Sequence, residues 1–491
     1  MLEPLTEALT FYGDTSAWLY LLIGTVWGLF VGAIPGIGSA FAMVIILPFT
    51  FTMSLVNSVI ILISTYTAAI YGGSISACLL SIPGTGGNIV TTFDGYPMTQ
   101  QGKAGLALGG SAIGSEIGNI LSCLFFIFVI PFFTKFALQF GPNEMFMLAL
   151  WGFVVSIIIS PGNKFKNTIA GIIGGVLSCI GIDPRYGIPR LTFGSARLLQ
   201  GVSLVPAILG VFAITVILQS VVGEKDLMSV VRQKTPKLSG FKELFDKWIV
   251  IVLLGSAAIG FLLGAIPGTG SIVACLIAYA IFKGISPHRN EYGKGSYEGV
   301  LVAETTNNAT HPGAILTTMV LGIPGEMVMV ILLGAFVLQG VQAGPVFAAT
   351  HQEYLYLVFI TIMMAGALIF ALAWTSLRFW VRIIQIPKAF LWPIIILTCA
   401  VGAYTIRFSI NDFLMMMAFG VFGFFAEEHG FSKVPLIMGL VLTPIMESHL
   451  QVGLMQGPVH LFFTKPIVIA LWVILISTCV LFLRVLRPKR E

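Results

Sequence analysis

Two short strings of proline, glycine and serine combine residue types that can hold a small anion inside a membrane. Residues 35–39 read Pro-Gly-Ile-Gly-Ser and residues 267–271 read Pro-Gly-Thr-Gly-Ser. Proline and glycine together break a helix, and a break at membrane depth must be buried in protein or line a wet cavity. A helix that starts anew at Ser39 or Ser271 points free N–H groups and its positive dipole end into that cavity, which favours an anion. The candidate anion-binding residues are Pro35, Gly36, Gly38, Ser39, Gly268, Gly270 and Ser271.

A second motif, SIPGTGGNIVTTFDGYPM at 81–98, follows an apolar run from Ile75 to Leu80. Its Asp-Gly and Tyr-Pro pairs are typical of turns, so one interpretation is a loop between two spans. The absence of a charge at its start favours a break within the membrane, where hydroxyl and amide groups can hold carboxylate oxygens or a cation. No phosphate-binding pattern is completed, so nucleotide binding is not expected. The candidates here are Pro83, Gly84, Thr85, Gly86 and Asn88, with Pro324 and Gly325 from a similar string.

A third polar segment, EGVLVAETTNNATHPGA at 298–314, precedes another apolar run. Glu304 and Asn308 are four residues apart, so they lie one above the other on a helix. Asn side chains near a helix break can ligate Na⁺ or bond a carboxylate, and an acidic residue inside a membrane is a candidate proton site. The alternative is a solvated helix that enters the membrane. The candidate residues for cation coupling are Glu304, Asn307, Asn308 and Thr310.

The elements that must position these residues are membrane-spanning helices. The chain has 491 residues, of which 57% are apolar and only 10% are charged, against about 25% charged in soluble domains. This composition excludes a soluble globular protein, and the 38 Phe and 8 Trp exclude disorder. The apolar runs are continuous, whereas a barrel would show alternation. At about 20 apolar residues per span, we expect an all-α polytopic membrane protein with about a dozen spans.

The sequence contains a repeated pattern that predicts a tandem duplication. Residues 27–39 and 259–271 agree at eight of thirteen positions, with an offset of 232. Three weaker matches follow in the same order at offsets from 229 to 249. In both copies, glycines four residues apart before the break are interpreted as helix-packing positions. We therefore expect one repeat at 15–222 and another at 248–455, each with broken or re-entrant helices.

The distribution of charge predicts how the two copies are oriented. No Lys or Arg precedes Lys103, whereas six lie within 223–247 and four end the chain at 484–490. Basic loops stay cytoplasmic, so we expect a periplasmic N-terminus, a cytoplasmic linker at 223–247 and a C-terminal transmembrane helix with a cytoplasmic tail at 466–491. The first residues lack the features of a signal peptide. The copies would then be inverted, which is typical of transporters with a ligand site where the copies meet.

Several segments together form a set of motifs: both PGxG strings, Tyr71–Gly84, Asp94–Met98, 101–105, 140–144, 189–194, Glu298–Ala309 and Leu321–Gly325. In these segments the sequence resembles the large membrane subunit of tripartite tricarboxylate transporters. The resemblance covers nearly the whole chain and implies a bacterial inner-membrane permease for organic carboxylates. It further implies a cation gradient as the driving force, a periplasmic substrate-binding protein and a small membrane subunit as partners.

The expected function is secondary active uptake of small di- or tricarboxylates. No ATPase motif is present, so the energy would come from a Na⁺ or H⁺ gradient, and which ion remains open. The alternatives are a passive anion channel and a membrane-embedded enzyme that acts on a lipid-linked substrate. No catalytic residue, cofactor or metal is expected, since the six Cys and six His are widely spaced. Other expected contacts are membrane lipid and, through a small-residue surface, a second copy in a homodimer; nucleic-acid binding has no support.

Overall fold

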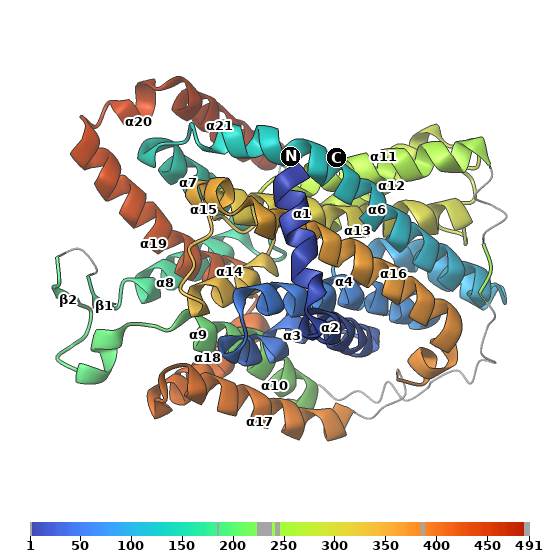
Figure 1. Cartoon of the computed structure of the whole chain (residues 1–491), viewed down its shortest axis with the longest axis horizontal. Helices are drawn as coiled ribbons and strands as arrows, with labels where there is room; N and C mark the ends of the chain where they lie inside the picture. Colours follow the sequence, from blue (N-terminus) through green and yellow to red (C-terminus); the bar gives the residue numbers. More distant parts are fainter. Residues whose placement is uncertain (1, 184–185, 223–237, 241–245, 384–387, 486–491) are drawn as a thin grey trace, which may run out of the picture.

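The computed structural model describes residues 2–183, 186–222, 238–240, 246–383 and 388–485. Most of the predicted cytoplasmic linker 223–247, and the end of the basic tail at 486–491, lie outside the described residues. The described chain is almost wholly helical (Figure 1). Its strands are β1 (Gly181–Ile182) and β2 (Pro189–Arg190), which pair antiparallel. The prediction of an all-α fold is confirmed.

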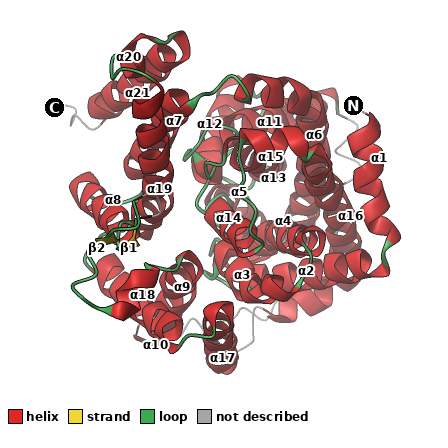
Figure 2. Ribbon diagram, turned by 60° about the vertical axis from the view of Figure 1, so that its left-hand side comes forward, coloured by secondary structure: helices red, strands yellow, loops and turns green. Residues whose placement is uncertain are grey.

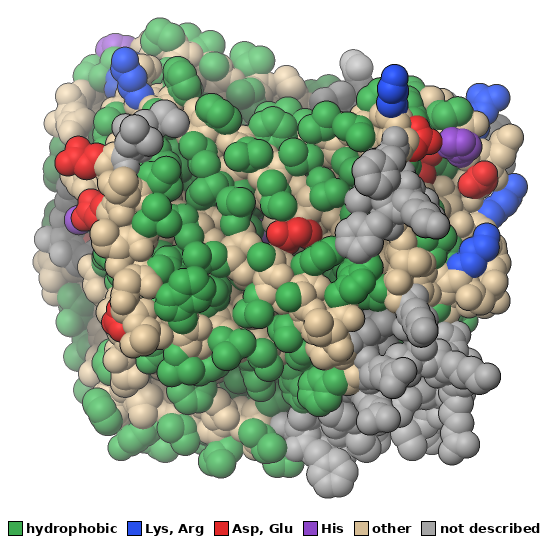
Figure 3. Space-filling view, turned by 45° about the vertical axis from the view of Figure 1, so that its right-hand side comes forward, with side chains coloured by type: hydrophobic (Ala, Val, Ile, Leu, Met, Phe, Trp, Pro, Cys, Tyr) green, Lys and Arg blue, Asp and Glu red, His purple; other side chains and the backbone are tan. Residues whose placement is uncertain are grey.

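Nine helical segments in the described part of the chain are long and apolar enough to cross a membrane. They are Thr15–Ala33 (α2), Leu55–Leu80 (α4), Ala104–Ala137 (α6), Pro142–Ile159 (α7), Leu204–Val222 (α9, η4 and α10), Lys247–Gly264 (α11), Gln352–Ser376 (most of α16), Ile410–Glu428 (α18) and Lys433–Gln456 (α19). Figure 3 shows a face covered mainly by hydrophobic side chains, with Lys and Arg at its edges. The chain is therefore a multi-pass membrane protein.

The remaining helices include several that begin or end at a break. They are α1 (Leu2–Thr10), η1 (Phe11–Gly13), α3 (Gly38–Ile46), η2 (Leu47–Thr52), α5 (Asn88–Gln100), α8 (Lys164–Ser178), η3 (Ala196–Gln200), α12 (Gly270–Ile285), α13 (Tyr297–Leu321), α14 (Met329–Leu338), α15 (Pro345–Thr350), α16 in full (Gln352–Ile383), α17 (Lys388–Arg407), α20 (Leu461–Thr464) and α21 (Pro466–Val485). Within the fifth segment, α9 covers Leu204–Leu209, η4 covers Gly210–Ile214 and α10 covers Thr215–Val222. Short helices such as α3 and α14 thus lie between the long ones.

Two almost fully buried helices, α4 and α13, form the centre of the molecule. Helix α2 packs along α4, and α11 packs along α13. A Cβ atom at Gly28 would meet the carbonyl oxygen of Thr65, and one at Gly264 would meet that of Thr310. Small residues let helix backbones approach this closely, so these glycines act in packing, as their spacing indicated.

The two halves of the sequence pack against each other reciprocally. Helix α6 contacts α13 while α16 contacts α4, and α8 contacts α19 while α18 contacts α9 and η4. Figure 2 shows α7, α8 and α19 as a group beside the helices that surround α4 and α13. Reciprocal contacts of this kind are expected of two related halves. The inverted orientation of the repeats and their bounds, 15–222 and 248–455, stay predictions.

Candidate functional site

The two PGxG strings lie at helix breaks, where the glycines adopt left-handed backbone conformations. Residues 34–37 separate α2 from α3, and residues 265–269 separate α11 from α12. The φ angles of Gly36, Gly38, Gly268 and Gly270 are +76°, +83°, +80° and +64°. Residues with a Cβ rarely adopt such angles. The backbone can therefore leave one helix and enter the next in this conformation because these positions are glycine.

A second pair of breaks follows the central helices. We call residues 81–87, after α4, the first return loop, and residues 322–328, after α13, the second return loop. Each begins at a residue with a left-handed backbone: φ is +58° at Ser81 and +71° at Gly322. A left-handed residue at this position ends a helix. The two loops thus leave their helices with the same backbone geometry.

The DGYPM segment is not a turn, so the interpretation of 94–98 as part of a loop between spans is wrong. These residues lie inside α5, with Pro97 in its last turn. The buried Asp94 accepts hydrogen bonds from the backbone N–H of Gly293 at 2.8 Å and of Ser296 at 2.8 Å, and from the hydroxyl of Tyr279 at 2.7 Å. These distant partners hold α5 against the loop before α13 and override the local turn preference.

The four breaks line one cavity of about 350 Å³. Parts of α4, α7, η4, α10 and α19 complete its wall. Of the candidates for substrate binding, those that line the cavity are Gly36, Gly38, Ser39, Pro83, Gly84, Thr85, Gly86, Gly268, Gly270 and Ser271. The others, Pro35, Asn88, Pro324 and Gly325, lie in or beside the same breaks. Residues from four separate segments of the sequence are thereby brought to one place.

Two charged side chains that line the cavity, Glu326 and Lys433, were missed by the sequence analysis. Glu326 belongs to the second return loop and is 7% exposed. Its carboxyl group lies beside the backbone N–H of Ser271, and its Oε1 has no hydrogen-bond partner in the described part of the chain. A signal was present, because Glu326 is the one Asp, Glu, Lys or Arg between Glu304 and Glu353 and it directly follows a Pro-Gly pair.

Lys433 brings a positive charge to the cavity wall. It is the first residue of α19, and its Nζ lies 3.2 Å from Oε1 of Glu427 and 6.0 Å from the ring centre of Phe212. A cation at a helix N-terminus opposes the helix dipole. The ion pair with Glu427 offsets this cost, and Lys433 can in addition attract an anion into the cavity.

Glu304 is not among the residues that line the cavity. Its carboxylate lies where α4, α5, α6 and α13 meet, and it accepts a hydrogen bond from the hydroxyl of Thr91. Further donors are Ser74 at 2.7 Å, Ser115 at 3.0 Å and Asn88 at 3.4 Å. A buried charge must be paired or hydrogen-bonded, and four donors meet that requirement for an ionised carboxylate without a cation.

The other three cation candidates are also buried on α13, so the alternative of a solvated helix is wrong. Asn308 donates to the hydroxyl of Ser115 at 2.9 Å, and Thr310 donates to a carbonyl oxygen of its own helix at 2.7 Å. The side-chain amide of Asn307 lies against Gly87 in the first return loop. Neither of its polar atoms has a hydrogen-bond partner among the described residues. A role in binding a cation stays a proposal for all three.

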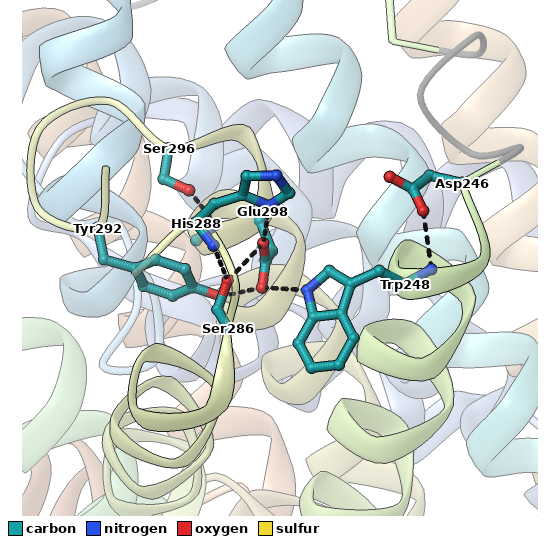
Figure 4. Close-up of polar contacts among 8 residues, drawn as sticks. Asp246, Trp248, Ser286, His288, Tyr292, Ser296 and Glu298 are labelled. Atoms are coloured by element: carbon teal, nitrogen blue, oxygen red, sulfur yellow. Dashed lines mark hydrogen bonds and ion pairs between the residues drawn. The ribbon is translucent and has the colours of Figure 1, made fainter. Parts of the chain in front are cut away.

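A second buried carboxylate, Glu298, fixes the start of α13 (Figure 4). It accepts hydrogen bonds from Trp248 Nε1 at 2.9 Å, the Tyr292 hydroxyl at 2.7 Å and the Ser286 hydroxyl at 3.0 Å, and His288 Nδ1 lies 3.3 Å away. Burial, and next the hydrogen bond to Glu298, raise the pKa of Tyr292 above its usual value. Its hydroxyl therefore stays protonated and donates. The cluster joins α11, the loop before α13 and α13 itself.

The described residues contain no group of three or more His, Cys, Asp or Glu side chains that could hold a metal ion. The six cysteines are free, and four of them are buried. The expectation that the protein needs no metal or cofactor stays untested. Polar chemistry in the described chain therefore centres on the cavity and on the carboxylates Glu304 and Glu298.

Breaks in membrane helices that meet at one internal cavity are typical of secondary transporters. The fold and the cavity therefore define a class of protein, the multi-pass helical membrane transporters with discontinuous helices. The cavity combines helix N-termini, hydroxyl groups and one lysine. This is the chemistry that a small anion requires.

Within that class, the chain belongs to the tripartite tricarboxylate transporter TctA family, whose model matches residues 18–438. The resemblance inferred from the motifs is confirmed, and membership implies a transporter subunit that works with other subunits. The chain is 33% identical, over 96% of its own length and 94% of the relative, to an uncharacterised 52.8 kDa protein of the TAR-I ttuC′ 3′ region of Agrobacterium vitis. It is 30% identical to an uncharacterised protein of the TAR-II ttuC′ 3′ region of the same organism, over 47% of this chain and 97% of the relative. No solved structure matches the chain significantly.

Proposed function

We propose that this chain is the permease subunit for secondary active uptake of small di- or tricarboxylates across the bacterial inner membrane. A Na⁺ or H⁺ gradient drives the uptake, and a periplasmic binding protein delivers the substrate. Membership of the TctA family supports a tricarboxylate transporter subunit. The single observation that carries the proposal is that four helix breaks, far apart in sequence, line one cavity.

The cavity offers three kinds of group to a carboxylate. The N-terminus of α3, where the capping residue Ile37 makes no side-chain hydrogen bond, presents backbone N–H groups. The hydroxyl group of Ser39 lines the same cavity, and Lys433, which also pairs with Glu427, supplies a positive charge. A substrate with two or three carboxylates can engage these groups at once, which favours a polycarboxylate over a small monovalent anion.

The proposed orientation places the N-terminus in the periplasm and residues 223–247 in the cytoplasm. Reporter fusions within 223–247 test it directly. Activity of a reporter that works only in the cytoplasm is expected at this position. Periplasmic activity would overturn both the orientation and the inverted-repeat argument that depends on it.

Uptake into proteoliposomes tests the function. The chain is reconstituted with the small membrane subunit of its transporter, and labelled citrate is supplied with the periplasmic binding protein. We expect citrate to accumulate above its external concentration only when a Na⁺ or H⁺ gradient is imposed. Equilibration without accumulation would indicate a passive channel, and chemical conversion of a lipid-linked substrate would indicate an enzyme.

A further inference from the structure

The second return loop places one carboxyl group inside the cavity in an incompletely bonded state. Glu326 lines the cavity and is 7% exposed, so more than nine-tenths of the residue is buried. Its Oε1 has no hydrogen-bond partner among the described residues. A buried carboxylate oxygen without a partner is costly, and the cost is removed when the group takes up a proton or a ligand.

Glu326 lies beside the N-terminus of α12, which is itself expected to bind substrate. The backbone N–H of Ser271, the second residue of α12, lies beside the Glu326 carboxyl group, and both residues line the cavity. A carboxylate at this position interacts favourably with the positive end of the helix dipole. Glu326 therefore occupies the N-terminus of α12 as the carboxylate of a bound substrate would. Among the described residues that line the cavity, no second acidic side chain lies at the N-terminus of α3, on the other PGxG break.

The other titratable groups of the cavity do not neutralise Glu326. Tyr66 on α4 lines the wall and lies edge-on to the ring of His311 on α13, at 5.3 Å between ring centres. Lys433 on α19 lines the wall but forms its ion pair with Glu427. The wall segments from α3, α7, η4, α10, α12 and the first return loop contribute no charged side chain.

We infer that Glu326 is the group that carries a proton together with the substrate, because its carboxylate holds the N-terminus of α12 until it is protonated. This inference rests on the proposed transport function. A proton from the periplasmic side forms an O–H bond on Glu326, and the neutral group releases the N–H of Ser271 to a substrate carboxylate. The N-terminus of α12 therefore faces a carboxylate at both stages: that of Glu326 before the proton binds, and that of the substrate afterwards. On the cytoplasmic side the substrate leaves, the proton dissociates to water, and Glu326 returns to α12.

Citrate binding at several pH values tests the linkage. The full chain with its small membrane subunit is titrated with citrate by calorimetry, in two buffers of different ionisation enthalpy, at pH values where citrate is fully ionised. We expect uptake of about one proton per citrate. The affinity for citrate should therefore fall about tenfold for each unit by which the pH rises. In Glu326→Gln, which keeps the size of the side chain, proton uptake should vanish and the affinity should become independent of pH. Proton uptake that is unchanged in Glu326→Gln would overturn the inference, since citrate would then bind in a protonated form.

Transport distinguishes carriage of a proton from a merely structural role. Glu326→Gln should exchange labelled for unlabelled citrate across proteoliposomes yet fail to accumulate citrate in response to a pH gradient. Glu326→Asp, which keeps a carboxyl group, should restore part of the accumulation. The matched control is Glu291→Gln, on an exposed loop residue, which should behave as the wild type. Full accumulation by Glu326→Gln would contradict the inference.

Infrared spectroscopy separates this inference from the choice of substrate. The carbonyl stretch of a protonated carboxylic acid is recorded during an acid titration of the protein without citrate, for the wild type and Glu326→Gln. A titrating band present only in the wild type is expected. If that band appears while citrate does not bind, the proposed substrate class fails and the proton site stands. If no band depends on Glu326, the inference fails whether or not citrate binds.

Discussion

The two return loops begin with the same backbone geometry and differ in the side chain that follows Pro-Gly. Both continue a long buried helix through a left-handed residue and an Ile-Pro-Gly string. The next residue is Thr85 in the first loop and Glu326 in the second, and both line the cavity. The same local geometry therefore carries a neutral hydroxyl on one side and a carboxyl group on the other.

The bonding of these two residues shows what the difference does. The backbone N–H of Thr85 donates to Oδ1 of Asn88 at 3.0 Å, and its hydroxyl donates to the same atom at 2.5 Å. Asn88 in turn donates to Ser74 and to Glu304. The first loop is thus tied through Asn88 to Ser74 and Glu304, whereas Glu326 keeps one oxygen without a partner among the described residues. The first return loop is held in place by hydrogen bonds, and the second carries a carboxyl group that can change its partner.

The largest expected effect comes from removing the carboxylate that anchors the first loop. Glu304→Ala removes an acceptor from four buried donors. Asn88 and Ser74 each keep another acceptor, whereas the hydroxyls of Thr91 and Ser115 lose theirs, and each buried group left unpaired costs about 1–3 kcal/mol. We expect a loss of at least about 2 kcal/mol of stability, seen as a large drop in unfolding temperature and yield of the purified protein. Glu326→Ala is the matched control and should lose far less. Similar losses in both variants would contradict the distinction between a fixed loop and an adaptable one.

Transport affinity tests whether the two PGxG breaks contribute alike. Ser39→Ala and Ser271→Ala each remove a cavity-lining hydroxyl. A hydrogen bond to a charged ligand is worth about 1.5–3 kcal/mol, so each variant should weaken the apparent affinity for citrate about ten- to a hundredfold at unchanged expression. Normal affinity in both variants would show that these serines do not bind substrate.

The sequence predicted the positions of the breaks better than their chemistry. Pro-Gly strings such as 35–39 have local causes, so their breaks can be read without a structure. The donors that surround Glu304 come from three other helices, and no local pattern reveals that Ser74 or Ser115 faces it. The alternative of a turn at 94–98 failed for the same reason, because the bonds of Asp94 to a distant loop outweigh local preference. Glu326 had a sequence signal, an isolated charge after Pro-Gly, but no indication of what faced it.

A smaller effect tests the similarity of the two loop backbones. A Cβ at Gly84 would lie 2.8 Å from the carbonyl oxygen of Gly32, and one at Gly325 would lie 2.6 Å from Cα of Ala314. Overpacking of this kind costs about 1–3 kcal/mol. We expect Gly84→Ala and Gly325→Ala to lower the unfolding temperature by comparable amounts. Gly284→Ala, on a helix where the added Cβ meets nothing within 4 Å, serves as the control and should not destabilise the protein.

The smallest expected effect extends the comparison to the helices before the PGxG breaks. Asp14 caps α2 and Asp246 caps α11, each by accepting a backbone N–H at 2.9 Å. The two residues are 232 positions apart, the same offset as the PGxG strings. An aspartate N-cap stabilises a helix by satisfying a free N–H group. Asp14→Ala and Asp246→Ala should therefore cause small and similar decreases in the unfolding temperature at neutral pH.

The effect at Asp14 should depend on pH. Hydrogen bonds from the backbone N–H and then the hydroxyl of Ser16 hold the pKa of Asp14 below its usual value. Because the pKa is lower in the folded than in the unfolded chain, the ionised cap stabilises the fold at neutral pH, and this contribution is lost as the pH falls through the folded-state pKa. The difference between the wild type and Asp14→Ala should thus shrink in acid, while Asp14→Asn, a good neutral cap, should differ little from the wild type throughout. A difference that persists unchanged in acid would mean that the cap acts through its neutral form, and the match between the two halves would then be one of shape and not of charge.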